Sequence, residues 1–104
     1  MKILGKEIEF NFEEAENIDK AIELDSKYEE KLKKANTFTE KSKVYRGFFD
    51  ELMGEGTSQK LFGDKNNFFE IIDAYQDVIK EAERITAETK RRTANLNKKY
   101  ERYK

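Results

Sequence analysis

Hydrophobic and polar residues alternate at the start of the chain. Ile8, Phe10 and Phe12 would lie on one face of an extended segment, and the residues between them are polar. A period of two residues is typical of a half-buried β-strand. Residues 2–4 can pair with this segment through a turn at Gly5-Lys6, which predicts an N-terminal β-hairpin or a single strand. Because two strands alone are only marginally stable, we expect a helix to pack on their apolar face.

After Asn11 the hydrophobic residues recur every three or four positions, as they do on one face of an amphipathic helix. Asn11 and Glu14 have the spacing of a capping box, which predicts that the first helix begins here. Polar residues near Asn36 predict its end. The apolar stripe of this helix consists of Ala15, Ile18, Ile22, Leu24, Tyr28, Leu32 and Ala35.

Further capping signals divide the rest of the chain. They are a capping box at Thr37 and Glu40, a C-cap at Gly54 after a helix that ends near Met53, a single turn that Thr57 N-caps and that runs to Phe62 before Gly63 ends it, and a cap at Asn67 and Glu70. The predicted fold class is therefore α+β and mainly α. It comprises an N-terminal β-hairpin or strand followed by three to four helices, the last one long.

The last predicted helix carries a heptad row of hydrophobic and small residues. Steps of four and three residues give Phe68, Ile72, Tyr75, Ile79, Ala82, Thr86, Thr89, Thr93, Leu96, Tyr100 and Tyr103. This row is apolar at its start and rich in threonine in its middle, which disfavours a stable homotypic coiled coil. We expect a helix that projects beyond the domain, frays alone and becomes ordered against a partner.

Composition and charge support one small domain with an extension. The chain has 104 residues, of which 37% are hydrophobic and 41% are charged. Residues 1–79 contain 12 basic and 18 acidic residues, a net charge of −6, whereas residues 80–104 contain 9 basic and 4 acidic residues, a net charge of +5. We therefore expect a compact body over residues 1–80 and a basic helical extension over residues 81–104, which can be partly disordered without a partner. The basic surface is either a solvated helix face or a docking site.

The residues that most often carry catalysis and metal binding are missing. Histidine and cysteine are absent from the chain, which removes the commonest general base, the commonest zinc ligands and thiol nucleophiles. The glycine-rich stretch GEGTSQK lacks the glycine that precedes lysine in a P-loop. Asp64 and Asn66 have calcium-loop spacing, but Phe68 and Phe69 replace the residues that such a loop requires next. We expect a protein that is not an enzyme and that holds no cofactor or metal.

Aromatic residues cluster around this glycine-rich stretch. The doublets Phe48-Phe49 and Phe68-Phe69 would lie on two helices that the glycines fold against each other. Adjacent residues on a helix point about 100° apart, so one member of each doublet is expected in the core and the other at its edge. Edge aromatics that line up are typical of partner surfaces. The predicted partner-binding residues are Phe48, Phe49, Leu52, Leu61, Phe62, Phe68, Phe69 and Tyr75.

Residues 1–80 resemble the tail assembly chaperones of long-tailed phages and prophages of low-GC bacteria. The resemblance rests on the opening MKILGKEIEFNF and on Phe49-Asp50-Glu51-Leu52, Gly54-Glu55-Gly56-Thr57, Lys60, Phe62-Gly63 and Ala74-Tyr75. It implies a small helical protein of the bacterial host cytoplasm that coats the tape-measure protein while the tail tube assembles. It also implies that the protein is absent from the finished particle. A long, aggregation-prone helical client requires an adaptable apolar surface and many copies, which fits a homo-oligomer.

Two other functions remain open from the sequence. One is a structural tail-completion or connector component that stays in the particle. The other is a small prophage regulator that binds nucleic acid through the basic extension, although nucleic acid is not the partner we expect. The basic residues concerned are Arg84, Lys90, Arg91, Arg92, Lys98, Lys99 and Arg102. No run approaches the roughly 20 apolar residues needed to span a bilayer, and the start of the chain lacks the apolar region of a signal peptide. A membrane is therefore not an expected partner.

Overall fold

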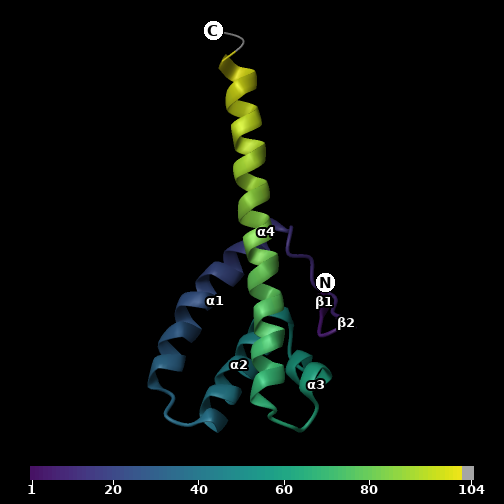
Figure 1. Ribbon diagram of the computed structural model, residues 1–104, viewed down its shortest axis with the longest axis vertical. Coiled ribbons are helices and arrows are strands. Elements are labelled where there is room, and N and C mark those ends of the chain that lie inside the picture. Colours follow the sequence, from purple (N-terminus) through teal and green to yellow (C-terminus); the bar gives the residue numbers. More distant parts are fainter. Residues whose placement is uncertain (102–104) are drawn as a thin grey trace.

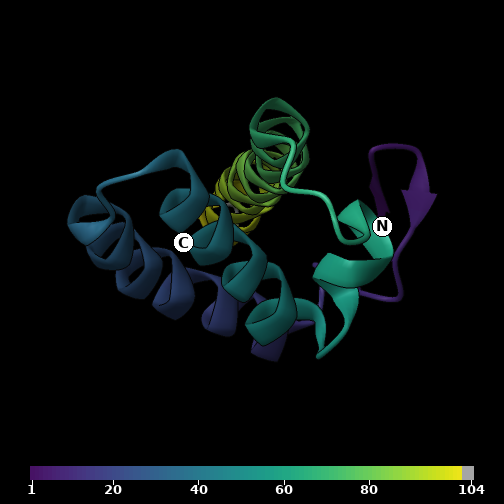
Figure 2. The ribbon, with the colours of Figure 1, turned by 90° about the horizontal axis from the view of Figure 1, so that it is seen from below.

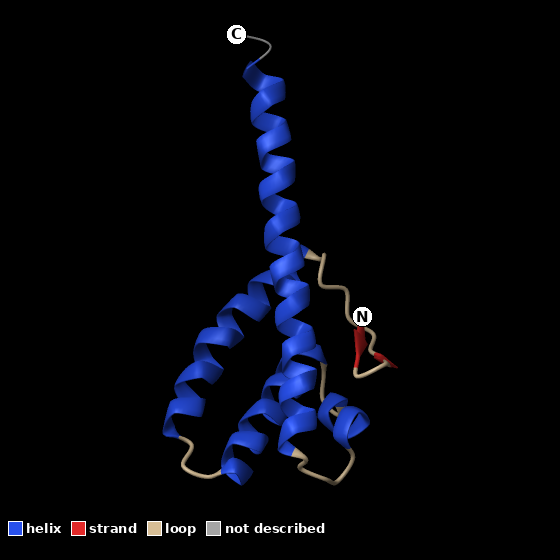
Figure 3. Ribbon diagram, viewed as in Figure 1, coloured by secondary structure: helices blue, strands red, loops and turns tan. Residues whose placement is uncertain are grey.

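A computed structural model describes the backbone of residues 1–101 and the side chains of residues 1–98. Its elements are β1 (Lys2–Ile3), β2 (Lys6–Glu7), α1 (Ala15–Lys34), α2 (Phe38–Met53), α3 (Thr57–Phe62) and α4 (Phe68–Glu101). A two-stranded antiparallel hairpin thus precedes the four helices of the described residues, and the last helix is the longest (Figures 1 and 3). The predicted α+β, mainly α class is confirmed.

The hairpin is shorter than the alternating pattern suggested. Lys2 pairs with Glu7 and Ile3 with Lys6, so the turn lies at Leu4-Gly5, one residue earlier than predicted. Both turn residues have positive φ angles, 53° and 75°, which a two-residue hairpin turn requires. The backbone amide of Leu4 donates to Asp77 Oδ2 of α4 at 3.0 Å, which ties the turn to the helix. The hairpin is therefore attached to α4, as the need for a covering helix predicted.

The segment after β2 stays extended but forms no strand. Ile8 and Phe12 are buried and Phe10 is half-buried, so the alternation correctly predicted which face turns inward. The predicted start of the first helix was wrong, because Asn11 Oδ1 accepts from the backbone amide of Glu13, two residues on, at 3.0 Å. This contact forms an Asx turn instead of an N-cap. Helix α1 begins only at Ala15.

The capping signals at Thr37, Gly54, Gly63 and Asn67 are confirmed. The amide of Glu40 donates to Thr37 Oγ1 at 3.1 Å, and the amide of Glu70 donates to Asn67 Oδ1 at 3.2 Å. Gly54 follows α2 with a φ of 113° and Gly63 follows α3 with a φ of 64°. An L-residue with a side chain is strained at such angles, so these two glycines set the helix ends.

The predicted N-cap at Thr57 is wrong, because Gly56 is the N-cap of α3 and the Thr57 hydroxyl donates to the carbonyl of Gly54 at 2.7 Å.

The core lies where α2, α3 and the first part of α4 meet beneath the hairpin. Phe49, Leu61 and Ile71 are fully buried there. Polar contacts hold the corner together: the Asp50 carboxylate accepts from the amide and the hydroxyl of Ser58 at 2.8 and 2.9 Å. The glycine-rich stretch therefore acts as a structural corner between α2 and α4.

Helix α2 packs against both α1 and α4, while α1 diverges from α4. Figure 1 shows α1 slanting away from α4, and Figure 2 shows α1 and α2 side by side. One face of α1 therefore contacts α2, and the side of α1 nearest α4 is left partly open. This divergence creates the groove described below.

Helix α4 has two halves with different surroundings. In the inner half, residues 68–85, the buried positions are Ile71, Ala74 and Val78, one residue before the predicted heptad positions Ile72, Tyr75 and Ile79. In the outer half, residues 86–101, Glu88 is half-buried and every other described side chain is exposed. The outer half projects from the body as a continuous helix, and no backbone break marks the predicted boundary at residue 80 (Figure 1). Within the described residues, no helix combines the length and apolar character needed to cross a membrane.

Candidate partner-binding groove

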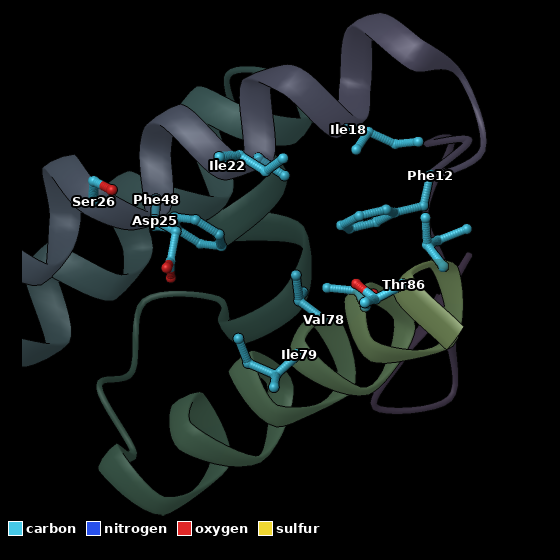
Figure 4. Close-up of a pocket in the computed structure, with 12 residues that line it drawn as sticks. Phe12, Ile18, Ile22, Asp25, Ser26, Phe48, Val78, Ile79 and Thr86 are labelled. Atoms are coloured by element: carbon cyan, nitrogen blue, oxygen red, sulfur yellow. The ribbon is translucent and has the colours of Figure 1, made fainter. Parts of the chain in front are cut away.

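An apolar groove of about 270 Å³ lies between α1 and the inner half of α4, with α2 as its floor. Figure 4 shows side chains from α1 and α4 facing each other across it. The lining residues are Phe12, Ile18, Ala21, Ile22, Asp25, Ser26, Phe48, Val78, Ile79, Ala82, Ile85 and Thr86. Most of them are aliphatic or aromatic, so the groove is suited to apolar ligands or apolar side chains.

The α1 wall is exposed because of how α1 packs. Leu24 and Tyr28 are buried against the body, which leaves Ile18 half-buried and turns Ile22 toward the opening. Ile22 is 66% exposed, although burying such a side chain is worth roughly 1.5–3 kcal/mol. A large aliphatic side chain at the rim of an apolar groove indicates a surface that a partner can cover.

The floor of the groove is closely packed. Phe48 of α2 is 3% exposed and makes edge-to-face contacts with Tyr28, Phe49 and Tyr75, with ring centroids 5.8, 5.7 and 5.3 Å apart. Such aromatic pairs stabilise by roughly 0.5–1.5 kcal/mol beyond burial. The floor therefore belongs to the core.

Two polar contacts join the walls at the ends of the groove. The Tyr75 hydroxyl of α4 donates to Asp25 Oδ1 of α1 at 3.1 Å. Burial, with the Asp25 charge adding to it, raises the pKa of Tyr75 well above its usual range, so the hydroxyl stays protonated at neutral pH. At the other end, Arg84 Nη2 of α4 donates to Glu13 Oε1 at 3.2 Å. The Arg84–Glu13 contact is an exposed ion pair, which contributes little, and the Tyr75–Asp25 contact is a single hydrogen bond, so few contacts fix the spacing of the walls.

The described residues offer no assembled metal centre, since no group of three or more acidic, histidine or cysteine side chains is placed to hold an ion. Asp25 is the one ionisable residue that lines the groove, and it already accepts the Tyr75 hydrogen bond. Asp64, from the stretch with calcium-loop spacing, accepts from Gln59 Nε2 at 2.8 Å. The arrangement favours binding of an apolar surface.

The eight predicted partner-binding residues are dispersed by the structure. Phe48, Phe49, Leu52, Leu61 and Phe62 are buried, Phe68 and Tyr75 are half-buried, and Phe69 is 79% exposed. The buried members are thus unavailable at the outer surface. Phe48 and Tyr75 meet at the groove, whereas the others do not form one surface.

The expectation of one core and one edge aromatic per doublet was wrong for the first doublet. Phe48 and Phe49 are both buried, because α1 covers one and α3 covers the other, with Phe49 5.6 Å from Phe62. In the second doublet Phe68 is half-buried and Phe69 is exposed. Phe68, Phe69 and the exposed Phe38 form a second apolar feature, the terminal aromatic patch, at the end of the body away from the projecting helix.

Sequence reasoning missed the groove walls. It placed Ile18 and Ile22 in the stripe of the first helix and Ile79 and Ala82 in the heptad row, but assigned none of them to a partner. A signal was present: Ile22 and Leu24 were put in one stripe, although two residues of helix separate their directions by about 200°. Both could not face the same core.

Fold and groove together define a small, mainly helical protein with an open apolar groove. The chain belongs to the DUF6673 family, a family of unknown function, which it matches over residues 4–104. No curated protein and no solved structure matches the chain.

Proposed function

We propose that this protein is a non-enzymatic tail assembly chaperone of a phage or prophage that binds helical segments of the tape-measure protein during tail morphogenesis. The observation that supports binding is the open apolar groove between α1 and α4. The resemblance of residues 1–80 to tail assembly chaperones suggests the client. The site of action would be the cytoplasm of the bacterial host.

An amphipathic helix is the ligand that best fits the groove. Such helices insert an apolar stripe, spaced by three and four residues, into grooves formed by other helices. Ile22 and Ile79 would contact the two edges of that stripe and Phe48 its centre. The weak polar contacts between the walls would let one groove accept many similar segments of a long client.

The charge around the groove indicates which clients are favoured. The segment from Glu13 to Asp25 carries six acidic residues and one lysine, so the surface around the α1 wall is acidic, although only Asp25 among them lines the groove. A client helix with lysine or arginine beside its apolar stripe would gain complementary charge, which mainly speeds association and selects the partner.

The alternative roles receive less support. In the outer half of α4, Arg91 Nη2 and Arg92 Nε lie 2.5 and 2.7 Å from Glu88 Oε1. In the inner half, Arg84 contacts both Glu13 and Glu81. These cations already have partners within the chain, which weakens the case for nucleic-acid binding. A structural tail-completion or connector role is distinguished by the protein composition of purified phage particles. Retention of this protein there in stoichiometric amounts would contradict the chaperone role.

Co-expression with a phage tape-measure protein, followed by pull-down and a binding isotherm, tests the proposal. We expect Ile22→Asp to weaken binding about 10-fold or more, since losing roughly 1.5–3 kcal/mol of burial has that effect. Phe38→Asp is the matched control, because Phe38 is also 66% exposed but lies in the terminal aromatic patch. It should change binding by less than about twofold.

Each outcome decides a separate point. If the wild-type protein does not bind the tape-measure protein, the chaperone proposal is wrong. If Phe38→Asp or Phe69→Asp abolishes binding while folded Ile22→Asp binds normally, the client occupies the terminal aromatic patch and the groove assignment is wrong. Thermal unfolding of each variant confirms that the exposed substitutions leave the fold intact.

A further inference from the structure

We infer that the groove selects a helical segment whose apolar stripe is about two turns long and ends, on the side of Asp25, at a lysine or arginine. This cation would pair with the carboxylates of Asp25 and Glu29 of α1. The identity of the segment as part of a tape-measure protein rests on the proposed function, whereas the selection of charge rests on the groove itself.

The apolar part of the groove is short. Its α4 wall runs from Ile79 to Thr86, which lie about 11 Å apart along the helix. Figure 4 shows Asp25 toward one end, the inner end, and Ile18 and Thr86 toward the other, the outer end. A helix with apolar residues at positions i, i+4 and i+7 carries a stripe of the same length, and this is the usual spacing of the anchors that a helix inserts into a groove.

The inner end is acidic because one row of α1 changes from apolar to acidic residues. Ile22, Asp25 and Glu29 follow one another at steps of three and four, so they lie on the same face of α1. Burial is the main cause of the raised pKa of Tyr75, and the charges of Asp25 and Glu29 add to it, so both carboxylates lie near the Tyr75 hydroxyl. One ammonium group, that of Lys33, lies 3.9 Å from Glu29, which leaves this cluster with a net negative charge.

Asp25 has room for a cationic partner. Its Oδ1 accepts the hydrogen bond from Tyr75, and within the described residues it forms no ion pair. Lys27, the nearest lysine in the sequence, contacts Glu51 at 2.7 Å instead. An ammonium or guanidinium group from a bound helix would therefore add a charge-assisted hydrogen bond at Asp25.

The outer end differs, because its charges are already paired. A second hollow of about 200 Å³ adjoins the groove there and shares Ile18 and Ile85 with it. Among its other lining residues, Arg92 contacts Glu88 at 2.7 Å, and Glu13 is paired with an arginine of α4 at 3.2 Å. An apolar side chain placed over these ion pairs would remove them from water without giving them a new partner. The apolar stripe of the ligand should therefore end here, and an added cation should gain little.

The difference between the two ends determines how a segment lies in the groove. A segment with a cation at one end of its apolar stripe gains the new contact only when that end lies at Asp25. A helix with a longer, continuous apolar stripe would place apolar side chains over the outer ion pairs. The groove therefore discriminates between helices by charge and by stripe length, through both an attractive and an unfavourable element.

Designed helical peptides test this selection on the full chain. The first peptide carries leucine at i, i+4 and i+7 and lysine at i−4, and the second has glutamate in place of that lysine. A second pair carries the same two residues at i+11, so that both chain directions are sampled. In at least one pair, the lysine peptide should bind about 10-fold more tightly than the glutamate peptide, because an attractive contact replaces a repulsive one. Fluorescence anisotropy at about 150 mM salt, where distant charges are screened, measures the ratio.

Matched variants locate the selecting charge. Asp25→Lys should reduce the ratio to about twofold or less. Glu23→Lys makes the same change of charge at an exposed position of α1 that does not line the groove, and it should keep the ratio near that of the wild type. Asp25→Asn keeps an acceptor for the Tyr75 hydroxyl and should give an intermediate ratio. Thermal unfolding of each variant confirms that it is folded.

Several results would overturn the selection of charge. Equal binding of the lysine and glutamate peptides by the wild type would do so, as would equal ratios in Asp25→Lys and Glu23→Lys. A wild-type dimer in sedimentation equilibrium that Ile22→Asp dissociates would also contradict it, because a second copy would then fill the groove.

Failure of this inference is distinguishable from failure of the proposed function. If the tape-measure protein does not bind but the peptide ratio depends on Asp25, the chaperone role is removed and the selection of charge is supported. If the tape-measure protein binds through Ile22 and Asp25→Lys changes neither that binding nor the peptide ratio, the proposed function stands and the selection of charge is wrong.

Discussion

The two halves of α4 form one continuous helix but are stabilised in different ways. In the inner half, Ile71 and Ala74 are fully buried and Val78 is 2% exposed, so tertiary packing holds the helix. In the outer half, the contacts are local: Glu88 pairs with Arg91 and Arg92, and the Thr89 hydroxyl bonds to the carbonyl of Ile85 in the preceding turn. A helix of about 16 residues held only by such contacts is marginal in water. The outer half therefore has most to gain from a partner.

The largest expected effect separates the two halves directly. Ile71→Ala should lower the free energy of unfolding by about 2–5 kcal/mol, because it leaves a cavity in the core. Leu96→Ala, the matched change in the outer half, should lower it by less than about 0.5 kcal/mol when measured on dilute, monomeric protein. Urea denaturation followed by circular dichroism measures both. If both variants lose the same free energy of unfolding, the outer half unfolds together with the core, which would contradict the difference described between the two halves.

A smaller effect is expected at the loop that leads into the inner half. Arg46 donates to the carbonyl oxygens of Gly63 at 2.7 Å and Lys65 at 3.1 Å, which fixes the path from α3 to α4. Arg46→Ala should cost about 1.5–3 kcal/mol of unfolding free energy. Arg46→Lys keeps the charge but not the planar fork and should lose most of the same amount. If the lysine variant is as stable as the wild type, charge alone fixes the loop.

Tyr75→Phe probes the contact between the groove walls. Removing the hydroxyl that donates to Asp25 should cost about 0.5–1.5 kcal/mol of unfolding free energy. Tyr45→Phe is the control, because no described residue hydrogen-bonds to the Tyr45 hydroxyl. If both variants lose the same free energy of unfolding, the loss in Tyr75→Phe does not come from the hydrogen bond to Asp25, and that bond does not hold the walls together.

The smallest effect concerns the pH dependence of the outer half. Hydrogen bonds from Arg91 and then Arg92 lower the pKa of Glu88 to about 2. Since this pKa is lower in the helix than in the unfolded chain, the stabilisation is present above the ordinary glutamate pKa and is lost as the pH falls toward 2. Carboxyl NMR titration should find Glu88 protonating below the other glutamates. A Glu88→Gln variant should show less acid-dependent loss of helix, and an ordinary pKa for Glu88 would contradict the pairing.

Local chemistry made much of the fold predictable. Thr37, Gly54, Gly63 and Asn67 act on neighbouring backbone groups, so their spacing alone correctly predicted helix starts and ends. Asn11 misled, because its side chain accepts from the backbone amide of Glu13, two residues on, instead of from that of Glu14. The heptad row in α4 was displaced by one residue from the buried row, since hydrophobic residues occupy both Ile71 and Ile72.

The groove depends on information that no single helix carries. Periodicity shows that Ile22 is apolar, but only the angle between α1 and α4 decides whether it is buried or exposed. Likewise, the burial of both Phe48 and Phe49 depends on α1 and α3 covering opposite sides of α2. Partner-binding residues were therefore sought in the aromatic doublets, although the structure places the open apolar surface at the aliphatic walls.

Hydrogen–deuterium exchange of the protein with and without the bound tape-measure protein tests the groove as the client site most directly. The account predicts added protection in two separate segments, residues 15–26 of α1 and residues 79–86 of α4, with little change around Phe38 and Phe69. Protection confined to the terminal aromatic patch, or to the outer half of α4 alone, would contradict it.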